Sequence, residues 1–179
     1  MSKSDQALEH IDIFSVAKNR QHVQTMVKLE AMPELASLLS AGEASDPFVV
    51  DIEGIEGDKG LPGALLTIHG TVFMNCVRCT KPVAVDIDRE VPFLFVKDEA
   101  QANAVPVEDE DWEIVVGSDH MNIAQWVQEE IILSLPGFPQ HDDCEAPQVL
   151  EDEQFEVAID EKPNPFAQLR EMLKEKQKN

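Results

Sequence analysis

The chain has 179 residues, of which 43% are hydrophobic and 27% are charged. That length and composition suit one domain, or one domain with a tail, and exclude a fibrous protein, a wholly disordered chain and a disulfide-dense scaffold. Lys and Arg number 14 against 35 Asp and Glu, so the net charge is −21 with neutral histidines.

The negative charge is concentrated in one part of the chain. Residues 98–161 contain no Lys or Arg and 19 Asp or Glu, whereas residues 162–179 hold five basic and two acidic side chains. A strongly acidic surface repels a phosphate backbone and attracts basic partners. An acidic excess also keeps a protein soluble without any partner, and the composition leaves both interpretations open.

The sequence shows no targeting or membrane-spanning pattern. The first ten residues lack the apolar core of a signal peptide, and no apolar run approaches the roughly 18 residues of a membrane span. Three cysteines are an odd and low number, unlike a secreted disulfide framework. A cytoplasmic location is therefore expected.

The first third of the chain is expected to form short elements. Helical turns are predicted over residues 14–20 and a strand over residues 23–31. Pro33 suits the first turn of a helix. Alternating apolar residues predict a half-buried strand over 48–53, and the glycines of residues 54–63 indicate a loop.

The centre of the chain predicts a long antiparallel hairpin. Residues 64–76 and 82–91 both alternate between apolar and polar side chains, and five residues join them. Arg89 interrupts the apolar row of the second strand. Residues 93–96 form a continuous apolar run.

The following elements are expected to be a loop, a strand and a helix. Residues 98–111 are polar and are predicted to form the loop, and residues 112–116 are a candidate strand. Asn122 can cap a helix over 123–135, whose apolar residues share one face.

The expected fold is therefore α+β. Residues 1–136 would form an antiparallel β-sheet with a long central hairpin, packed by a few helices. Residues 137–179 would form an irregular acidic segment and a short amphipathic helix over 166–176. That helix is marginal alone in water, so it should dock on the same domain or on a partner.

The cysteines suggest a metal site at the tip of the hairpin. Cys76 and Cys79 have the C-x2-C spacing at the turn, and His141 and Cys144 follow the predicted helix with the same spacing. Together they would make a Cys3His zinc site. The alternatives are three free thiols, or a redox pair formed by Cys76 and Cys79, although the C-x2-C does not open a helix.

The sequence contains no recognised catalytic motif, so no enzymatic activity is expected. There is no phosphate-binding glycine loop, nucleophile elbow or zinc-protease motif. Glu129 and Glu130 are adjacent on the predicted helix and point apart, which favours a solvated face over a catalytic carboxylate pair.

Three stretches of the chain carry distinctive motifs. Residues 76–82 read Cys-Val-Arg-Cys-Thr-Lys-Pro, with a C-x-R-C segment at the end of a predicted strand. Residues 127–136 fit a V-x-(D/E)-E-(I/L)-(I/L)-L-x-L-P helix, and residues 162–169 fit a K-P-N-P-F-A-x-L segment. In their order and spacing, over nearly the whole chain, these motifs resemble the YceD family of bacterial large-subunit ribosomal RNA accumulation proteins.

The resemblance implies a small cytoplasmic α+β protein needed for accumulation of large-subunit ribosomal RNA. In many bacteria the family's gene neighbours that of a small, basic, zinc-ribbon-like protein of the large ribosomal subunit. Many relatives carry a second cysteine cluster. This chain has only Cys144 there, with His141 before it.

The sequence and the resemblance together indicate two possible functions. The first is a ribosome-biogenesis factor that acts through a basic large-subunit ribosomal protein. The second is direct binding of large-subunit ribosomal RNA precursor by the hairpin tip and the basic C-terminus. A thiol redox protein is a remote alternative. The residues expected to contact a protein or RNA partner are Arg78, Lys81, Glu129, Glu130, Asn164, Phe166, Arg170 and Lys174.

Overall fold

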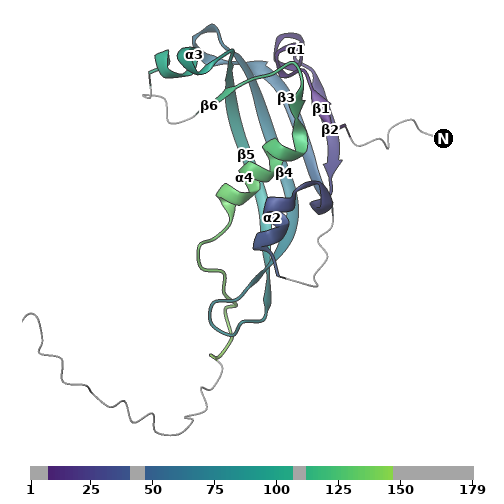
Figure 1. Cartoon of the computed structure of the whole chain (residues 1–179), viewed down its shortest axis with the longest axis vertical. Coiled ribbons are helices and arrows are strands. Elements are labelled where there is room, and N and C mark those ends of the chain that lie inside the picture. The colour runs from purple at the N-terminus through teal and green to yellow at the C-terminus, as the bar shows by residue number, and fades with distance from the viewer. Residues whose placement is uncertain (1–7, 41–46, 107–111, 147–179) are drawn as a thin grey trace, which may run out of the picture. The chain divides into compact units, whose positions relative to one another are not determined.

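A computed structural model describes residues 8–40, 47–106 and 112–146 (Figure 1). Its helices are α1 (Ile13–Asn19), α2 (Pro33–Leu38), α3 (Glu99–Ala104) and α4 (Ile123–Ser134), with 3-10 turns η1 (Leu29–Ala31) and η2 (Asp58–Gly60). Its strands are β1 (His10–Ile11), β2 (His22–Val27), β3 (Phe48–Glu56), β4 (Pro62–Asn75), β5 (Pro82–Val96), β6 (Glu113–Val116) and β7 (Met121–Asn122).

Five strands form the main sheet in the order β2-β3-β4-β5-β6. All neighbours are antiparallel except β5 and β6, which are parallel, and β1 pairs separately with β7. The β4–β5 pair runs without a bulge from Gly63 opposite Leu94 to Asn75 opposite Pro82. The predicted α+β class and the long central hairpin are confirmed.

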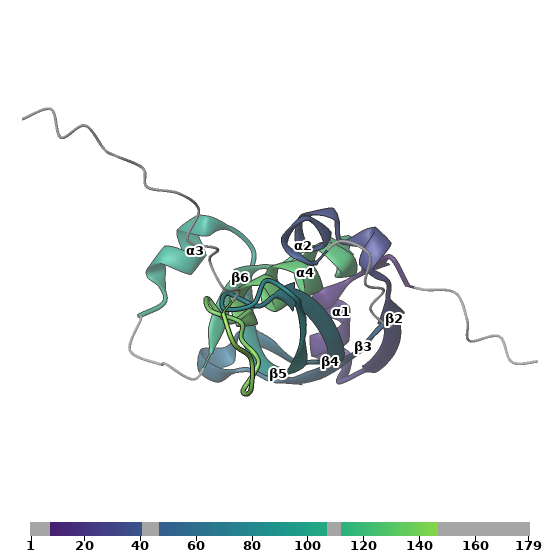
Figure 2. The ribbon, with the colours of Figure 1, turned by 90° about the horizontal axis from the view of Figure 1, so that it is seen from below.

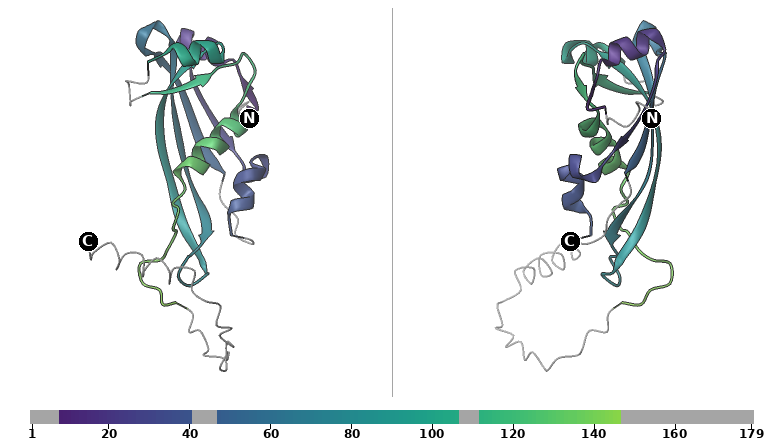
Figure 3. Two further views of the ribbon diagram at one scale, coloured as in Figure 1. Left: turned by 60° about the vertical axis from the view of Figure 1, so that its left-hand side comes forward. Right: turned by 90° about the vertical axis from the view of Figure 1, so that its right-hand side faces the viewer.

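Helices α2 and α4 lie over the same face of the sheet (Figure 2). Figure 3 shows α4 running obliquely across the strands. The buried apolar side chains of the strands face the layer formed by these helices, and aromatic rings pack against one another there. Trp126 of α4 meets Phe93 and Phe95 of β5 edge-on, with ring centroids 5.0 Å and 5.7 Å apart. Such a geometry is favourable for aromatic pairs, so it fixes α4 on the sheet.

Four local expectations were wrong. The strand predicted over 23–31 ends at Val27 and is followed by η1, because Leu29 to Ala31 close a 3-10 turn. The loop expected over 54–63 is shorter, since β3 continues to Glu56 and β4 begins at Pro62. The two apolar segments at 82–91 and 93–96 are one strand of 15 residues. Pro92 does not break it, because β6 pairs with β5 only from Phe93 onward and a strand edge tolerates proline.

The fourth wrong expectation is the loop over 98–111, because α3 forms within it. The Asp98 side chain caps this helix by accepting a hydrogen bond from the Gln101 amide at 2.8 Å. None of the helix's residues is buried, so it has no apolar stripe that a sequence pattern could reveal. The helix over 123–135 is confirmed, with Asn122 as its cap. The helix predicted over 166–176 lies outside the described residues.

Candidate metal centre

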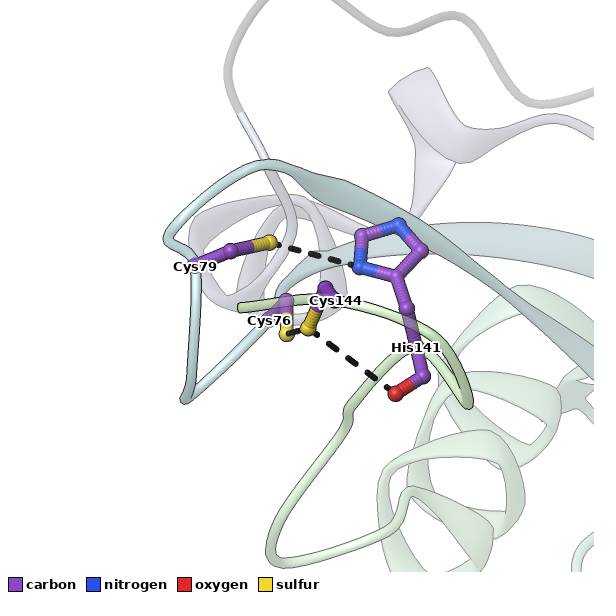
Figure 4. Close-up of side chains that lie close together, drawn as sticks. All are labelled: Cys76, Cys79, His141 and Cys144. Carbon is purple, nitrogen blue, oxygen red and sulfur yellow. Dashed lines mark hydrogen bonds between the residues drawn. The ribbon is translucent and has the colours of Figure 1, made fainter. Parts of the chain in front are cut away.

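The tip of the β4–β5 hairpin is a tight loop over residues 76–81. The Cys76 amide donates to the Lys81 carbonyl, and the Thr80 amide donates to the Cys76 carbonyl, both at 2.9 Å. Thr80 has a φ of 61°, in the left-handed region. This backbone turn brings Cys76 and Cys79 to the same side of the loop (Figure 4).

The segment that follows α4 returns to this tip and supplies the second pair of ligands. It is anchored by the Val77 amide, which donates to the Pro139 carbonyl at 2.9 Å. The Arg78 guanidinium donates to the Cys144 carbonyl at 2.9 Å and to the Gln140 side-chain oxygen at 3.3 Å. The two loops are therefore joined by direct hydrogen bonds as well as by the cluster itself.

Cys76, Cys79, His141 and Cys144 form a cluster that could hold a metal ion, with their ligand atoms all within 4.8 Å of one another. The Cys76 and Cys144 sulfurs are 3.6 Å apart, and the Cys79 sulfur is 3.4 Å from His141 Nδ1. In a tetrahedral zinc site, bonds of about 2.3 Å to sulfur and 2.0 Å to nitrogen imply edges of about 3.8 Å and 3.5 Å. The S–S separation of 3.6 Å and the S–N separation of 3.4 Å therefore fit a tetrahedral metal site.

The histidine is also oriented as a metal ligand. His141 Nε2 lies 3.0 Å from the Pro82 carbonyl oxygen, which can only accept a hydrogen bond. Nε2 must therefore carry the proton, and in the neutral ring Nδ1 keeps its lone pair. A carbonyl behind the ring is the usual partner that fixes the tautomer of a metal-bound histidine.

Two thiols of the cluster have pKa values that are shifted in opposite directions. Burial opposes ionisation of Cys76, but hydrogen bonds from the backbone of Cys79, His141 and Arg78 outweigh it and lower the pKa of Cys76 from 9.0 to about 5. Burial, together with the neighbouring Cys76 and Cys79, raises the pKa of Cys144. The cluster thus offers one thiolate readily at neutral pH, and a bound cation would favour ionisation of the others.

The structure places the predicted contact residues in different environments. Lys81 is exposed at the hairpin tip, whereas Arg78 is engaged with the loop that carries Cys144. Glu129 is exposed on α4, where its carboxylate accepts a hydrogen bond from the Gln125 side chain at 3.3 Å. The other four predicted residues, Asn164, Phe166, Arg170 and Lys174, lie outside the described residues.

Glu130 is buried beneath α4 and belongs to a charged cluster that the sequence interpretation missed. Arg89 of β5 lies 3.3 Å from a Glu113 carboxylate oxygen and 3.7 Å from a Glu130 carboxylate oxygen. Burial and then the negative charge of Glu113 raise the pKa of Glu130, against the opposing effect of Arg89. The charged cluster could have been suspected from Arg89, because this cation interrupts an otherwise apolar row in the sequence.

Fold and site together describe a small α+β protein with a Cys3His cluster that joins a hairpin tip to the segment after the main helix. The sequence profile of one family, described as large ribosomal RNA subunit accumulation protein YceD, matches residues 65–173. The chain belongs to the YceD family, and its role is in the accumulation of large-subunit ribosomal RNA.

The matched segment includes the hairpin, the cluster and α4. No solved structure matches the chain. Among the described residues, no helix is both long and apolar enough to cross a membrane.

Proposed function

We propose that this protein supports large-subunit ribosomal RNA accumulation in the cytoplasm by binding a basic protein of the large ribosomal subunit, without catalysing a reaction. One observation carries the proposal: residues 98–161 contain 19 acidic side chains and no Lys or Arg. A surface with such a field attracts basic proteins, and it would cover their cations before they meet RNA.

The contacts at the hairpin tip support a protein partner. Arg78, one of the two cations of the hairpin tip, hydrogen-bonds the chain's own Cys144 carbonyl and Gln140 side chain, which leaves Lys81 as the exposed cation there. The segment that carries Cys144 exposes three carboxylates, from Asp142, Asp143 and Glu145. The local charge is therefore better matched to a basic polypeptide than to a polyanion.

Affinity purification of the tagged full-length chain at low salt, with and without nuclease, tests this function. The expected result is one or more basic large-subunit ribosomal proteins that stay bound after nuclease treatment. Retention of RNA alone, lost on nuclease treatment, would contradict the proposal. A triple variant with Asp142 and Asp143 changed to Asn and Glu145 changed to Gln should retain less of the partner. A matched triple variant with Asp86→Asn, Asp88→Asn and Glu90→Gln on β5 should retain as much as the wild type.

We further propose that the ion held by the cluster is zinc and that its role is structural. Thiolate and imidazole ligands in a closed tetrahedral set are typical of structural zinc sites. Elemental analysis of the purified chain should give about one zinc per chain. A Cys76→Ser variant should lose it, and an equal zinc content in the two proteins would contradict the assignment.

Direct RNA binding is the second candidate, because Lys81 is exposed at the hairpin tip and five Lys or Arg lie in residues 162–179. A gel shift with large-subunit RNA at low salt distinguishes it, since phosphate contacts weaken steeply as salt rises. The remote redox alternative has less support, because Cys76 and Cys79 lie in the loop of a β-hairpin and not at the start of a helix.

A further inference from the structure

The hairpin tip and the end of α4 carry apolar side chains that the fold leaves in solvent. Among the described residues, the three most exposed large hydrophobic side chains are Phe138 at 83%, Leu133 at 71% and Val77 at 55%. Val77 and Phe138 are close in the fold, because the Val77 amide donates a hydrogen bond to the carbonyl of Pro139, the neighbour of Phe138. Contiguous exposed apolar side chains are typical of interaction sites.

Acidic side chains flank this apolar group. Asp142 and Asp143 are exposed shortly after Phe138, in the segment that the Val77 amide anchors to the tip. The described residues from 98 to 146 contain no Lys or Arg. The tip loop carries two cations, of which Arg78 is bound to the Cys144 carbonyl and Lys81 is exposed. An occupant of this surface must therefore offer both an apolar side chain and positive charge.

The segment that carries Phe138 is fixed at both ends. Pro136 follows the last turn of α4, and the Pro139 carbonyl accepts the Val77 amide. His141 then binds the Pro82 carbonyl through its ring. A side chain presented from an anchored loop loses little conformational freedom on binding, which favours affinity.

We propose that the tip patch, defined as Val77, Phe138, Asp142 and Asp143, is the docking site for a basic polypeptide segment that contains an apolar anchor residue. The anchor packs on the Phe138 and Val77 side chains, while Lys or Arg on either side of it meets the carboxylates. An Arg guanidinium can also stack on the Phe138 ring. This inference rests on the proposed function and names the surface through which it would act.

Two synthetic peptides of equal length and equal positive charge test the patch. Both are rich in Lys and Arg, and they differ only in two central residues, which are Leu in one and Ser in the other. Fluorescence anisotropy with the full-length, zinc-loaded chain at about 0.15 M ionic strength measures both affinities. The Leu peptide should bind about tenfold more tightly than the Ser peptide, as expected for one buried anchor.

Phe138→Ser should abolish the difference between the two peptides and leave the melting temperature unchanged. Met26→Ser, which alters another exposed hydrophobic residue (50%) on β2, should preserve the difference. The double variant Asp142→Asn and Asp143→Asn should lower the affinity for both peptides. Equal wild-type affinity for the two peptides would overturn the proposal, as would an equal loss in the Phe138 and Met26 variants.

Single-stranded RNA is the competing occupant, since it could stack a base on Phe138. An unstructured oligonucleotide that binds more tightly than the Leu peptide, and loses affinity in Phe138→Ser, would overturn the proposal in favour of RNA. The proposed function fails separately, if the wild type retains no basic ribosomal protein. If wild type and Phe138→Ser retain the same ribosomal protein equally, the function stands and the patch is refuted.

Discussion

Removing the metal from the Cys3His cluster should destabilise the fold by a predictable amount. His141 lies 62 positions after Cys79 in the sequence. A bound ion joins these residues as a cross-link does, and chain-entropy estimates for a loop of this length give about 4 kcal/mol at 25 °C. For a domain of this size, that free energy corresponds to a fall in melting temperature of about 10 °C.

Thermal unfolding of the zinc-loaded chain, with and without a strong chelator, measures this effect. Cys144→Ser is the matched control, because it removes one ligand and leaves the backbone contacts of the loop in place. The variant should melt close to the chelated wild type and respond little to the chelator. A wild-type melting temperature that is unchanged by chelation would refute the cross-link argument. So would a serine variant that responds as strongly as the wild type.

Three further predictions concern the domain that supports the cluster. Gln128→Ala should lower the free energy of unfolding by about 1–3 kcal/mol in urea titrations, because the buried Gln128 side chain accepts hydrogen bonds from two amides in the first turn of α2. Gly54→Ala should cost about 3 kcal/mol by the same assay, since the new Cβ would lie against an α1 carbonyl oxygen and force the helix away. Glu130→Gln should remove a pH dependence of stability. The pKa of Glu130 is raised above 4.5 in the folded state, so wild-type stability falls as pH rises from 4.5 through that raised pKa. The variant should therefore gain stability relative to the wild type between pH 4.5 and neutrality, and parallel pH profiles would contradict the burial argument.

The hairpin could be predicted because the sequence pattern that specifies it lies within a short stretch of the chain. Each strand shows the two-residue alternation of a sheet with one buried face, and the turn is short. The extension of β5 through Pro92 could not be predicted in the same way. Whether a proline ends a strand depends on the neighbouring strand, and β6 reaches β5 only from Phe93 onward. That pairing joins segments that are separated by α3.

The four metal ligands could be identified because their residue types are rare in this chain and their spacing is characteristic. Their surroundings could not. The Pro82 carbonyl that orients His141, and the Arg78 side chain that holds the Cys144 loop, act on residues about 60 positions away. Glu130 was expected on the surface because α4 carries it beside Glu129. Adjacent helical positions diverge by about 100°, and this rotation turns Glu130 inward to Arg89.

The fate of the arginines bears on the choice between a protein and an RNA partner. All three arginines in the described residues make contacts within the chain. Arg20 pairs with Glu56, Arg78 holds the Cys144 loop and Arg89 lies between Glu113 and Glu130. Arginine is the side chain best suited to bidentate phosphate contacts, and these guanidinium groups are already engaged. Because these arginines are already paired, the lysines are the more available cations of the described surface, while the tip patch keeps its carboxylates exposed. The local charges therefore favour a basic protein partner more strongly than the net charge alone does.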